Sequence, residues 1–323
     1  MCQKYKRKLV TQKIRQRKEQ QKSMNRRKIR TTLCKVLAGV LIGLQLFGAA
    51  APMQAHAAEE TVYYVALGDS ITAGNDTYVS IVANYLENKN GDCVSTNLGV
   101  SGWSSEDLLA AMTDSTHAGY AAIQNALKKA DVITLDIGSN DIVNAAYETV
   151  ADCFGCEVSG LEAAMTSLQN RLDSKNKLTA MKAYIEMLSI ARSIRSEFNS
   201  QKNLNRLATE FQNNYTQILA IIASKAPQAK VYIGNLYNPY YGAPSIYMGG
   251  IEVVDTEAVM ERSVTVLNNV IANYANGNTV VDIYSTINSS DYIQVNEENY
   301  DYNPHPNSAG QRAIANKFIE AMK

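Results

Sequence analysis

Residues 63–74 read YYVALGDSITAG, an apolar run with β-branched and aromatic side chains that ends abruptly in Gly68, Asp69 and Ser70. Such a run is typical of a buried parallel strand that gives way to a turn and then to a helix. Ser70 is then expected at the carboxyl end of a sheet, where open α/β sheets bind their ligands. A helix that begins there would leave the Ser70 amide free to point into a site, with the positive end of the helix dipole behind it. Taken alone, the same residues also fit an ordinary helix cap.

Three further blocks of glycine and small polar residues follow along the chain. Residues 97–102 read NLGVSG and residues 138–141 read GSND, and each block comes directly after a short apolar run. Near the end of the chain, residues 303–307 read NPHPN. With these four blocks in this order, residues 61–323 resemble the SGNH (GDSL) family of serine esterases and lipases.

The periodicity of residues 61–323 alternates between short apolar runs and helical spacing. Strand, helix, strand, helix, strand predicts parallel pairing with right-handed crossovers. We therefore expect an α/β fold, a flavodoxin-like three-layer sandwich with a five-stranded parallel sheet. Ser104 and Asp107 fit an acidic version of a capping box at the start of one helix. The five predicted strands are the runs 63–67, 93–98, 132–137, 230–236 and 279–284.

The segment after the third predicted strand is helical over about 142–226, with no convincing strand. It is longer than a simple crossover and leaves the sheet beside the expected site. Two interpretations stay open: a lid over the site, or a cover for one face of the sheet. The loop 237–242 reads YNPYYG and also leaves a strand end, so its tyrosines are candidates to line an acyl or sugar pocket.

The N-terminal 57 residues differ in charge from the rest of the chain. The 323 residues hold 31 basic and 31 acidic side chains, but 14 of the basic ones and a single acidic one, Glu19, lie in residues 1–57. The rest of the chain therefore carries 17 basic and 30 acidic residues. This acidic balance argues against nucleic acid as a partner, because phosphate binding needs clustered Lys and Arg.

Residues 1–57 have the order of a secretory signal peptide. A basic stretch reaches Lys35, an apolar run covers 36–51, and the sequence Ala-His-Ala occupies 55–57. We expect cleavage there, a secreted protein without stable membrane insertion, and one hydrolase domain over 58–323. Retention as an N-terminal membrane anchor is the alternative, although the apolar run is shorter than the roughly 20 residues that span a bilayer.

Three cysteines, Cys93, Cys153 and Cys156, lie beyond residue 57. The two-residue spacing between Cys153 and Cys156 predicts a small local disulfide in an exported protein. Cys93 is expected to be a buried strand residue. A zinc site would need two more ligands near the cysteine pair, and none is evident. We expect no metal and no cofactor.

A catalytic serine needs a base within hydrogen-bond reach, and histidine is the usual one because its pKa lies near neutral pH. The chain has three histidines. His56 leaves with the signal peptide, and His117 is expected at the surface. His305 stands between two prolines that restrict its backbone, directly before the last predicted helix. The resemblance implies that Ser70 is the nucleophile and His305 the base.

The acid that orients the histidine usually stands three residues before it in the family. That position holds Tyr302 here, and the nearest carboxylate is Asp301, four residues before His305. Either the loop bulges and Asp301 still reaches the second ring nitrogen, or a backbone carbonyl orients the ring and the site is a dyad. We assign Asp301 as the third member. Both arrangements can function, since removing the acid from such a triad costs less than removing serine or histidine in at least one measured case.

Attack on an acyl carbon creates an oxyanion that needs preorganised donors. The resemblance assigns three: the backbone N–H of Ser70, the backbone N–H of Gly102 and the side-chain amide of Asn140. Glycine lets the backbone approach a substrate closely, and a neutral amide donates without burying an ion. Taken singly, Gly102 and Asn140 are also ordinary turn residues. Asp69 and Asp141 are expected to brace the loops.

These observations predict a secreted serine esterase or lipase that cleaves carboxylic esters through an acyl-enzyme. The substrate stays open between lipid or short-chain acyl esters and O-acetylated carbohydrate. The alternative is a non-catalytic binding protein that keeps the fold. A dinucleotide-binding enzyme is disfavoured because the first strand lacks a G-x-G-x-x-G loop, and a metal-dependent hydrolase would need more histidines.

Overall fold

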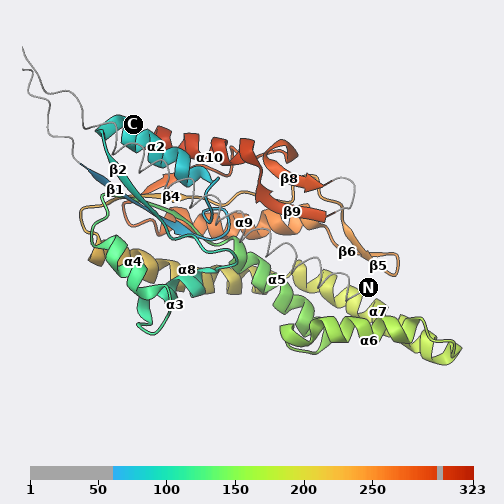
Figure 1. Ribbon diagram of the computed structural model, residues 1–323. Helices are drawn as coiled ribbons and strands as arrows, with labels where there is room; N and C mark the ends of the chain where they lie inside the picture. Colours follow the sequence, from blue (N-terminus) through green and yellow to red (C-terminus); the bar gives the residue numbers. More distant parts are fainter. Residues whose placement is uncertain (1–60, 297–300) are drawn as a thin grey trace, which may run out of the picture. The chain divides into compact units, whose positions relative to one another are not determined.

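The computed structural model describes residues 61–296 and 301–323. Five strands form one parallel sheet in the order β2-β1-β3-β4-β7 (Figure 1). This order is that of flavodoxin-like sheets, so the predicted α/β fold with a five-stranded parallel sheet is confirmed. The strands are β1 (Val62–Gly68), β2 (Cys93–Asn97), β3 (Val132–Asp136), β4 (Lys230–Gly234) and β7 (Thr279–Val281).

Helices cover both faces of the sheet, as Figure 1 shows. Successive residues of β1 point to opposite faces: Tyr64 and Ala66 enter one core, and Val65 and Leu67 enter the other. The first core is closed by α2 (Tyr78–Asn90) and α10 (Ser308–Ala321). The second core is closed by α3 (Ser105–Thr113), α4 (Tyr120–Leu127), α8 (Gln201–Lys225) and α9 (Thr256–Asn273). The capping box predicted for Ser104 and Asp107 is present at the start of α3.

The helical segment after β3 divides into parts with different partners. Its last helix, α8, packs on the sheet, so this part covers a sheet face. A small separate core joins α7 to the antiparallel hairpin of β5 (Ile246–Met248) and β6 (Ile251–Val254). The other helices of the segment are α5 (Ser139–Phe154), the 3-10 turn η1 (Val158–Gly160), α6 (Leu161–Leu172) and α7 (Lys177–Phe198).

A second antiparallel hairpin precedes α10. It consists of β8 (Ile293–Asn296) and β9 (Asp301–Pro306), after the 3-10 turn η2 (Ser290–Tyr292). The sequence predicted no strands here, and His305 lies within β9. Gln294 pairs with Asn303 and Ile293 pairs with Pro306, so His305 lies where the pairing is irregular. For residues 295, 296, 301, 302 and 304 the description covers the backbone alone.

Two predictions about side chains away from the sheet need correction. Cys153 and Cys156 are free thiols, so the predicted disulfide is wrong. Their spacing belongs to a helix end: Gly155 caps α5 in the left-handed conformation, and the Cys156 thiol lies 3.7 Å from the Ala151 carbonyl. Cys93 is half-buried in the edge strand β2.

His117 is partly exposed. Its ring meets Trp103 edge-on, with the ring centroids 5.7 Å apart, and its Nδ1 accepts the N–H of Gly119. Among the residues that the structure describes, no helix has the length and apolar character needed to cross a membrane.

Candidate active site

Ser70 lies in a tight turn immediately after β1. The Asp69 carboxylate accepts the N–H of Ile71 at 2.9 Å, and the Asp69 carbonyl accepts the N–H of Ala73 at 2.9 Å. A side chain at Gly68 would bring a Cβ to 2.3 Å from the Asp136 carbonyl, which explains glycine at that strand end. The predicted helix behind Ser70 is absent: a single turn follows, and the next helix, α2, begins only at Tyr78. The helix-dipole argument for the Ser70 amide is therefore wrong.

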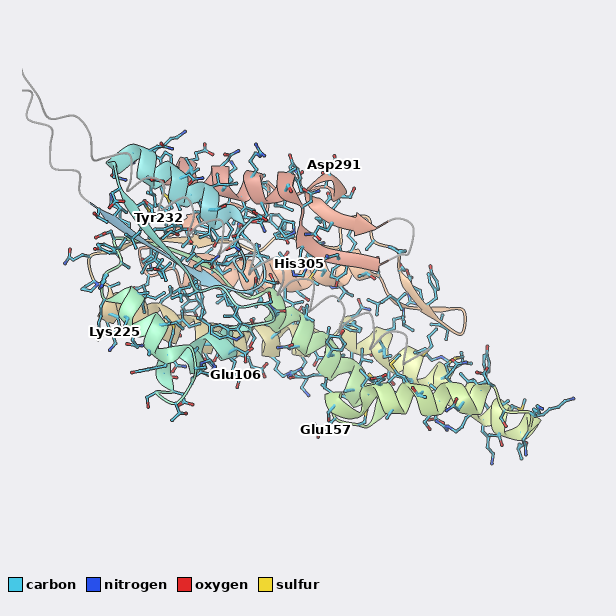
Figure 2. The ribbon with its side chains drawn as sticks, in the orientation of Figure 1. Glu106, Glu157, Lys225, Tyr232, Asp291 and His305 are labelled. Carbon is cyan, nitrogen blue, oxygen red and sulfur yellow. The ribbon has the colours of Figure 1, made fainter. Side chains whose placement is uncertain are left out.

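The Oγ of Ser70 and the Nε2 of His305 are hydrogen-bonded at 2.7 Å, although 235 residues separate them in the chain. His305 lies near the end of β9, shortly before α10, and is labelled in Figure 2. Burial lowers the pKa of its imidazole below the usual 6.5. At neutral pH His305 is therefore uncharged and has a lone pair for the serine proton.

The other ring nitrogen of His305 contacts Asn303. The Oδ1 of Asn303 lies against Nδ1 of His305 and also accepts the backbone N–H of His305 at 3.2 Å. The Nδ2 of Asn303 donates to Gln294 Oε1 at 2.9 Å, and Gln294 Nε2 donates to the Pro306 carbonyl at 3.0 Å. Because an amide oxygen only accepts, Nδ1 of His305 must carry the proton, and Nε2 is left to accept from Ser70.

Asn303 was missed by the sequence reasoning, which looked for a carboxylate. A usable signal was present, since Asn303 is the first residue of the block 303–307. Asp301, assigned as the third member, starts β9, and its side chain lies outside the part of the chain that the structure describes. Asn303 is thus the described partner of His305 Nδ1.

Asn140 lies in the first turn of α5 and borders the same pocket as Ser70 and His305. Its Nδ2 donates to the Trp103 carbonyl at 2.9 Å, which holds the loop containing Gly102 against α5. Gly102 itself has φ +89°, a backbone conformation that favours glycine, and a Cβ there would meet no neighbouring atom. Backbone conformation therefore explains this glycine better than crowding does.

Three buried carboxyls lie beneath these loops. Burial raises the pKa of Asp69 to about 7, and the charge of Asp141 adds to the increase. Burial, together with the charge of Asp69, raises the pKa of Asp136 well above its usual value. Burial also raises the pKa of Asp141 to about 6, although Ser105 donates to it through its N–H at 2.8 Å and its hydroxyl. Asp69 thus accepts an N–H of the serine turn, and Asp141 accepts the N–H of the first residue of α3, as expected of bracing residues.

Gln311 connects the C-terminal helix to the serine turn. This buried side chain of α10 accepts the N–H of Tyr78 at 2.8 Å and donates to the Ile71 carbonyl at 3.1 Å. It therefore ties the turn that carries Ser70 to the helix that directly follows His305. No local pattern in the sequence marks Gln311, because its partners lie more than 230 residues away.

A pocket of about 270 Å³ opens beside the Ser70–His305 pair. Tyr237, Pro239 and Tyr240 line it, so the aromatic loop does contribute to the pocket wall. Tyr241 and Tyr247 are exposed and lie outside this lining. The remainder of the wall is mostly apolar and includes Ile142, Val143, Leu236, Met260 and Val264.

The fold and site define an α/β protein with a hydrogen-bonded Ser–His pair at the carboxyl edge of a parallel sheet. The profile of the GDSL-like Lipase/Acylhydrolase family matches residues 66–313, so the chain belongs to this family. Membership supports hydrolysis of carboxylic esters as the class of reaction. No curated protein matches the chain.

Several solved structures resemble the chain. The lipase Lip_vut3 from a goat rumen metagenome shares 19% identity, with 80% of this chain and 97% of that chain covered, and a TM-score of 0.50. An extracellular lipase from Streptomyces rimosus shares 15% identity, with 80% of this chain and 99% of that chain covered, and a TM-score of 0.47. Phospholipase A1 from Streptomyces albidoflavus NA297 shares 18% identity, with 80% of this chain and 97% of that chain covered, and a TM-score of 0.43. The likeness to Lip_vut3, at 19% identity, shows the fold alone.

Proposed function

We propose that the protein is a secreted serine hydrolase that cleaves carboxylic esters through an acyl-enzyme. Ser70 Oγ attacks the acyl carbon while Nε2 of His305 takes the hydroxyl proton. Collapse of the tetrahedral intermediate expels the alcohol, which receives that proton. Water then attacks the acyl-enzyme, His305 takes a proton from it and returns it to Ser70, and the carboxylic acid leaves.

The observation that carries this proposal is the 2.7 Å contact between Ser70 and His305 at one end of an apolar pocket. Asn303 supports it, because its oxygen selects the imidazole tautomer that general-base catalysis needs. Asp301 stays the alternative orienting residue. The backbone N–H groups of Ser70 and Gly102 and the Asn140 amide are the proposed donors to the oxyanion.

Covalent labelling tests the mechanism directly. A fluorophosphonate should modify Ser70, as located by mass spectrometry, and S70A should lose both labelling and hydrolysis of a chromogenic acetate ester. We expect a loss of roughly three orders of magnitude or more. An S70A protein with near wild-type hydrolysis would refute the assignment. A wild-type protein that is folded, unlabelled and inactive on all esters would favour the non-catalytic binding protein.

We also propose that residues 1–57 are an export signal and that residues 58–323 form the hydrolase domain, with the helical insertion at about 142–226. N-terminal sequencing of protein collected from the culture medium should start at Ala58. A protein found only in the membrane fraction with its first 57 residues intact would support the anchor instead.

A further inference from the structure

The pocket beside Ser70 adjoins a second pocket. The second one has a volume of about 310 Å³ and lies between α5, the start of α8, α9 and the β5–β6 hairpin. The two pockets share five lining residues, so they are direct neighbours. The shared residues are Ile142, Val143, Tyr147, Tyr240 and Met260.

Helix α5 lines both pockets and gives their direction relative to each other. Asn140 lies at the reaction centre, and Val150 lines the second pocket. At 1.5 Å of rise per residue, the ten residues between them correspond to about 15 Å along the helix axis. The second pocket therefore extends away from Ser70 in one direction, as a linear substituent of a substrate would.

The wall of the second pocket is mainly apolar. It includes Ala146 and Val150 of α5, Leu204 and Leu207 of α8, and Val259 and Met260 of α9. Its polar side chains include Thr149, Asn203, Thr256 and Ser263, which already donate to other groups of the protein. A sugar placed there would therefore bury hydroxyl groups with few free partners, which costs free energy for each unpaired group. A hydrocarbon chain has no hydrogen-bonding groups to leave unpaired, and its transfer from water into an apolar pocket is favourable.

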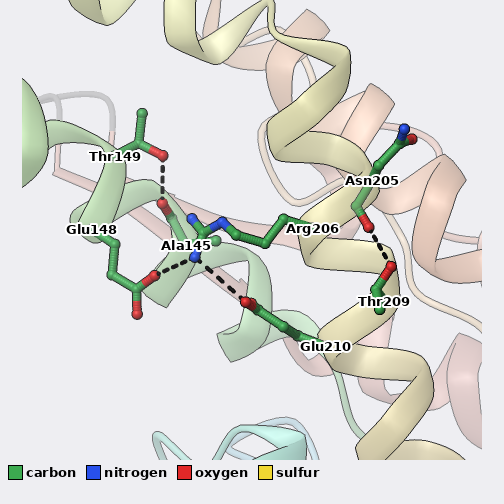
Figure 3. A network of polar contacts seen from close by, with 7 residues as sticks. All are labelled: Ala145, Glu148, Thr149, Asn205, Arg206, Thr209 and Glu210. Atoms are coloured by element: carbon green, nitrogen blue, oxygen red, sulfur yellow. Dashed lines mark hydrogen bonds and ion pairs between the residues drawn. The ribbon is translucent and has the colours of Figure 1, made fainter.

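Arg206, a cationic residue that lines the second pocket, is already ion-paired within the protein. Arg206 of α8 is ion-paired with Glu148 of α5 at 3.0 Å and with Glu210 at 3.6 Å (Figure 3). These partners raise the pKa of Arg206. The ion pair with Glu148 joins α8 to α5 along the edge of the pocket, whereas the ion pair with Glu210 lies within α8. Arg206 is therefore engaged by the protein itself.

The space on the other side of the Ser70–His305 pair has a different character. A hollow of about 330 Å³ there is lined mainly by polar side chains, among them Asp76, Gln294 and Asn307. The two sides of the pair therefore differ in polarity. A substrate with one apolar and one polar part has a single favourable orientation across Ser70.

We propose that the two adjoining apolar pockets together bind the acyl chain of a medium- or long-chain fatty acyl ester, with the alcohol part on the polar side of Ser70. This inference rests on the proposed function and specifies its substrate class. It assigns the second pocket to a hydrocarbon chain and so favours fatty acyl esters over acetylated carbohydrates as substrates.

The test is the acyl-chain profile of p-nitrophenyl acetate, butyrate, octanoate and palmitate for four proteins. Ala146→Phe fills the second pocket from α5, and Val259→Phe fills it from α9; neither residue borders the first pocket. Asn144→Phe is the matched control, because Asn144 is exposed on the same helix and lines neither pocket. Circular dichroism and labelling by a short-chain fluorophosphonate verify the fold and the site of each variant.

The wild type should hydrolyse octanoate with a higher kcat/KM than acetate. Each filling variant should lower the octanoate-to-acetate ratio of kcat/KM about tenfold or more, and N144F should keep the wild-type ratio. A wild type that prefers acetate, or two folded and labelled filling variants with the wild-type ratio, would overturn the inference while leaving the esterase intact. A wild type with no activity on any ester, acetate included, would overturn the proposed function as well.

Discussion

Asn303 and His305 lie two residues apart on β9, and the side-chain oxygen of Asn303 contacts both the ring Nδ1 and the backbone N–H of His305. A neutral amide orients the imidazole in the way that a carboxylate does. It lacks the negative charge that would stabilise an imidazolium and raise the histidine pKa. The site therefore combines an oriented histidine with a lowered pKa.

Removal of the Asn303 side chain should reduce catalysis by loss of orientation. In Asn303→Ala we expect kcat/KM for a chromogenic ester to fall about tenfold or more, because His305 no longer has a fixed tautomer. Asp301→Asn is the comparison: unchanged activity in D301N assigns the positioning role to Asn303. If instead D301N is impaired and N303A is normal, Asp301 is the third member.

A carboxylate at position 303 should change the pH profile. In Asn303→Asp the new charge beside Nδ1 favours the imidazolium, so the acidic limb of the kcat/KM profile should move up by about one pH unit. The measurement is kcat/KM across the acidic range for wild type and N303D. Superimposable limbs in the two proteins would show that residue 303 does not act on the His305 ring.

The acidic limb of the wild type should itself lie below pH 6.5. Burial lowers the pKa of His305, and the proposed base must be neutral to accept the Ser70 proton, so activity is lost only as pH falls through this lowered value. The rate of fluorophosphonate labelling against pH gives an independent measure. A limb clearly above pH 6.5 would mean that a negative group stabilises the imidazolium, which fits Asp301.

Gln311 should matter for both stability and activity. Gln311→Ala removes the acceptor of the Tyr78 N–H and the donor to the Ile71 carbonyl, and leaving buried backbone groups unpaired costs about 1–3 kcal/mol. Because the serine turn loses its link to α10, kcat/KM should also fall. Denaturant unfolding and ester hydrolysis measure the two effects.

Gln124 is a matched control for Gln311. Its side chain is also buried, and it donates to the Met112 carbonyl at 2.9 Å, with no contact to the serine turn. Gln124→Ala should lower the free energy of unfolding and leave kcat/KM unchanged. Equal losses of activity in Q124A and Q311A would show that general destabilisation explains both.

Asp69 should make the domain less stable as pH rises from about 4 to 7. Its folded pKa of about 7 lies above the unfolded value of 3.8, so the folded state binds the proton more tightly. The resulting stabilisation, of order 1–4 kcal/mol, is complete below the unfolded pKa and disappears as pH rises through the folded pKa. Asp69→Asn keeps an acceptor for Ile71 and cannot titrate, so its melting temperature should fall less over this range. Parallel curves for wild type and D69N would contradict the assignment.

The sequence by itself determined the sheet and the positions of two central residues. Strand runs such as 132–137 depend on the character of adjacent side chains, and strand ends are marked locally by Gly68 or Gly138. Ser70 and His305 were singled out by the resemblance to the SGNH family, which the blocks around Ser70 and at 303–307 carry. The spacing of Cys153 and Cys156 led to the wrong prediction of a disulfide, because the two residues flank the glycine that ends α5.

Only the tertiary structure decided which side chains meet around Ser70. The Asn303 contact depends on the pairing of β8 with β9, the link from Gln311 spans more than 230 residues, and the second pocket forms where α5, α8 and α9 pack together. Such contacts arise from how distant segments pack, and no periodicity along the chain records that packing.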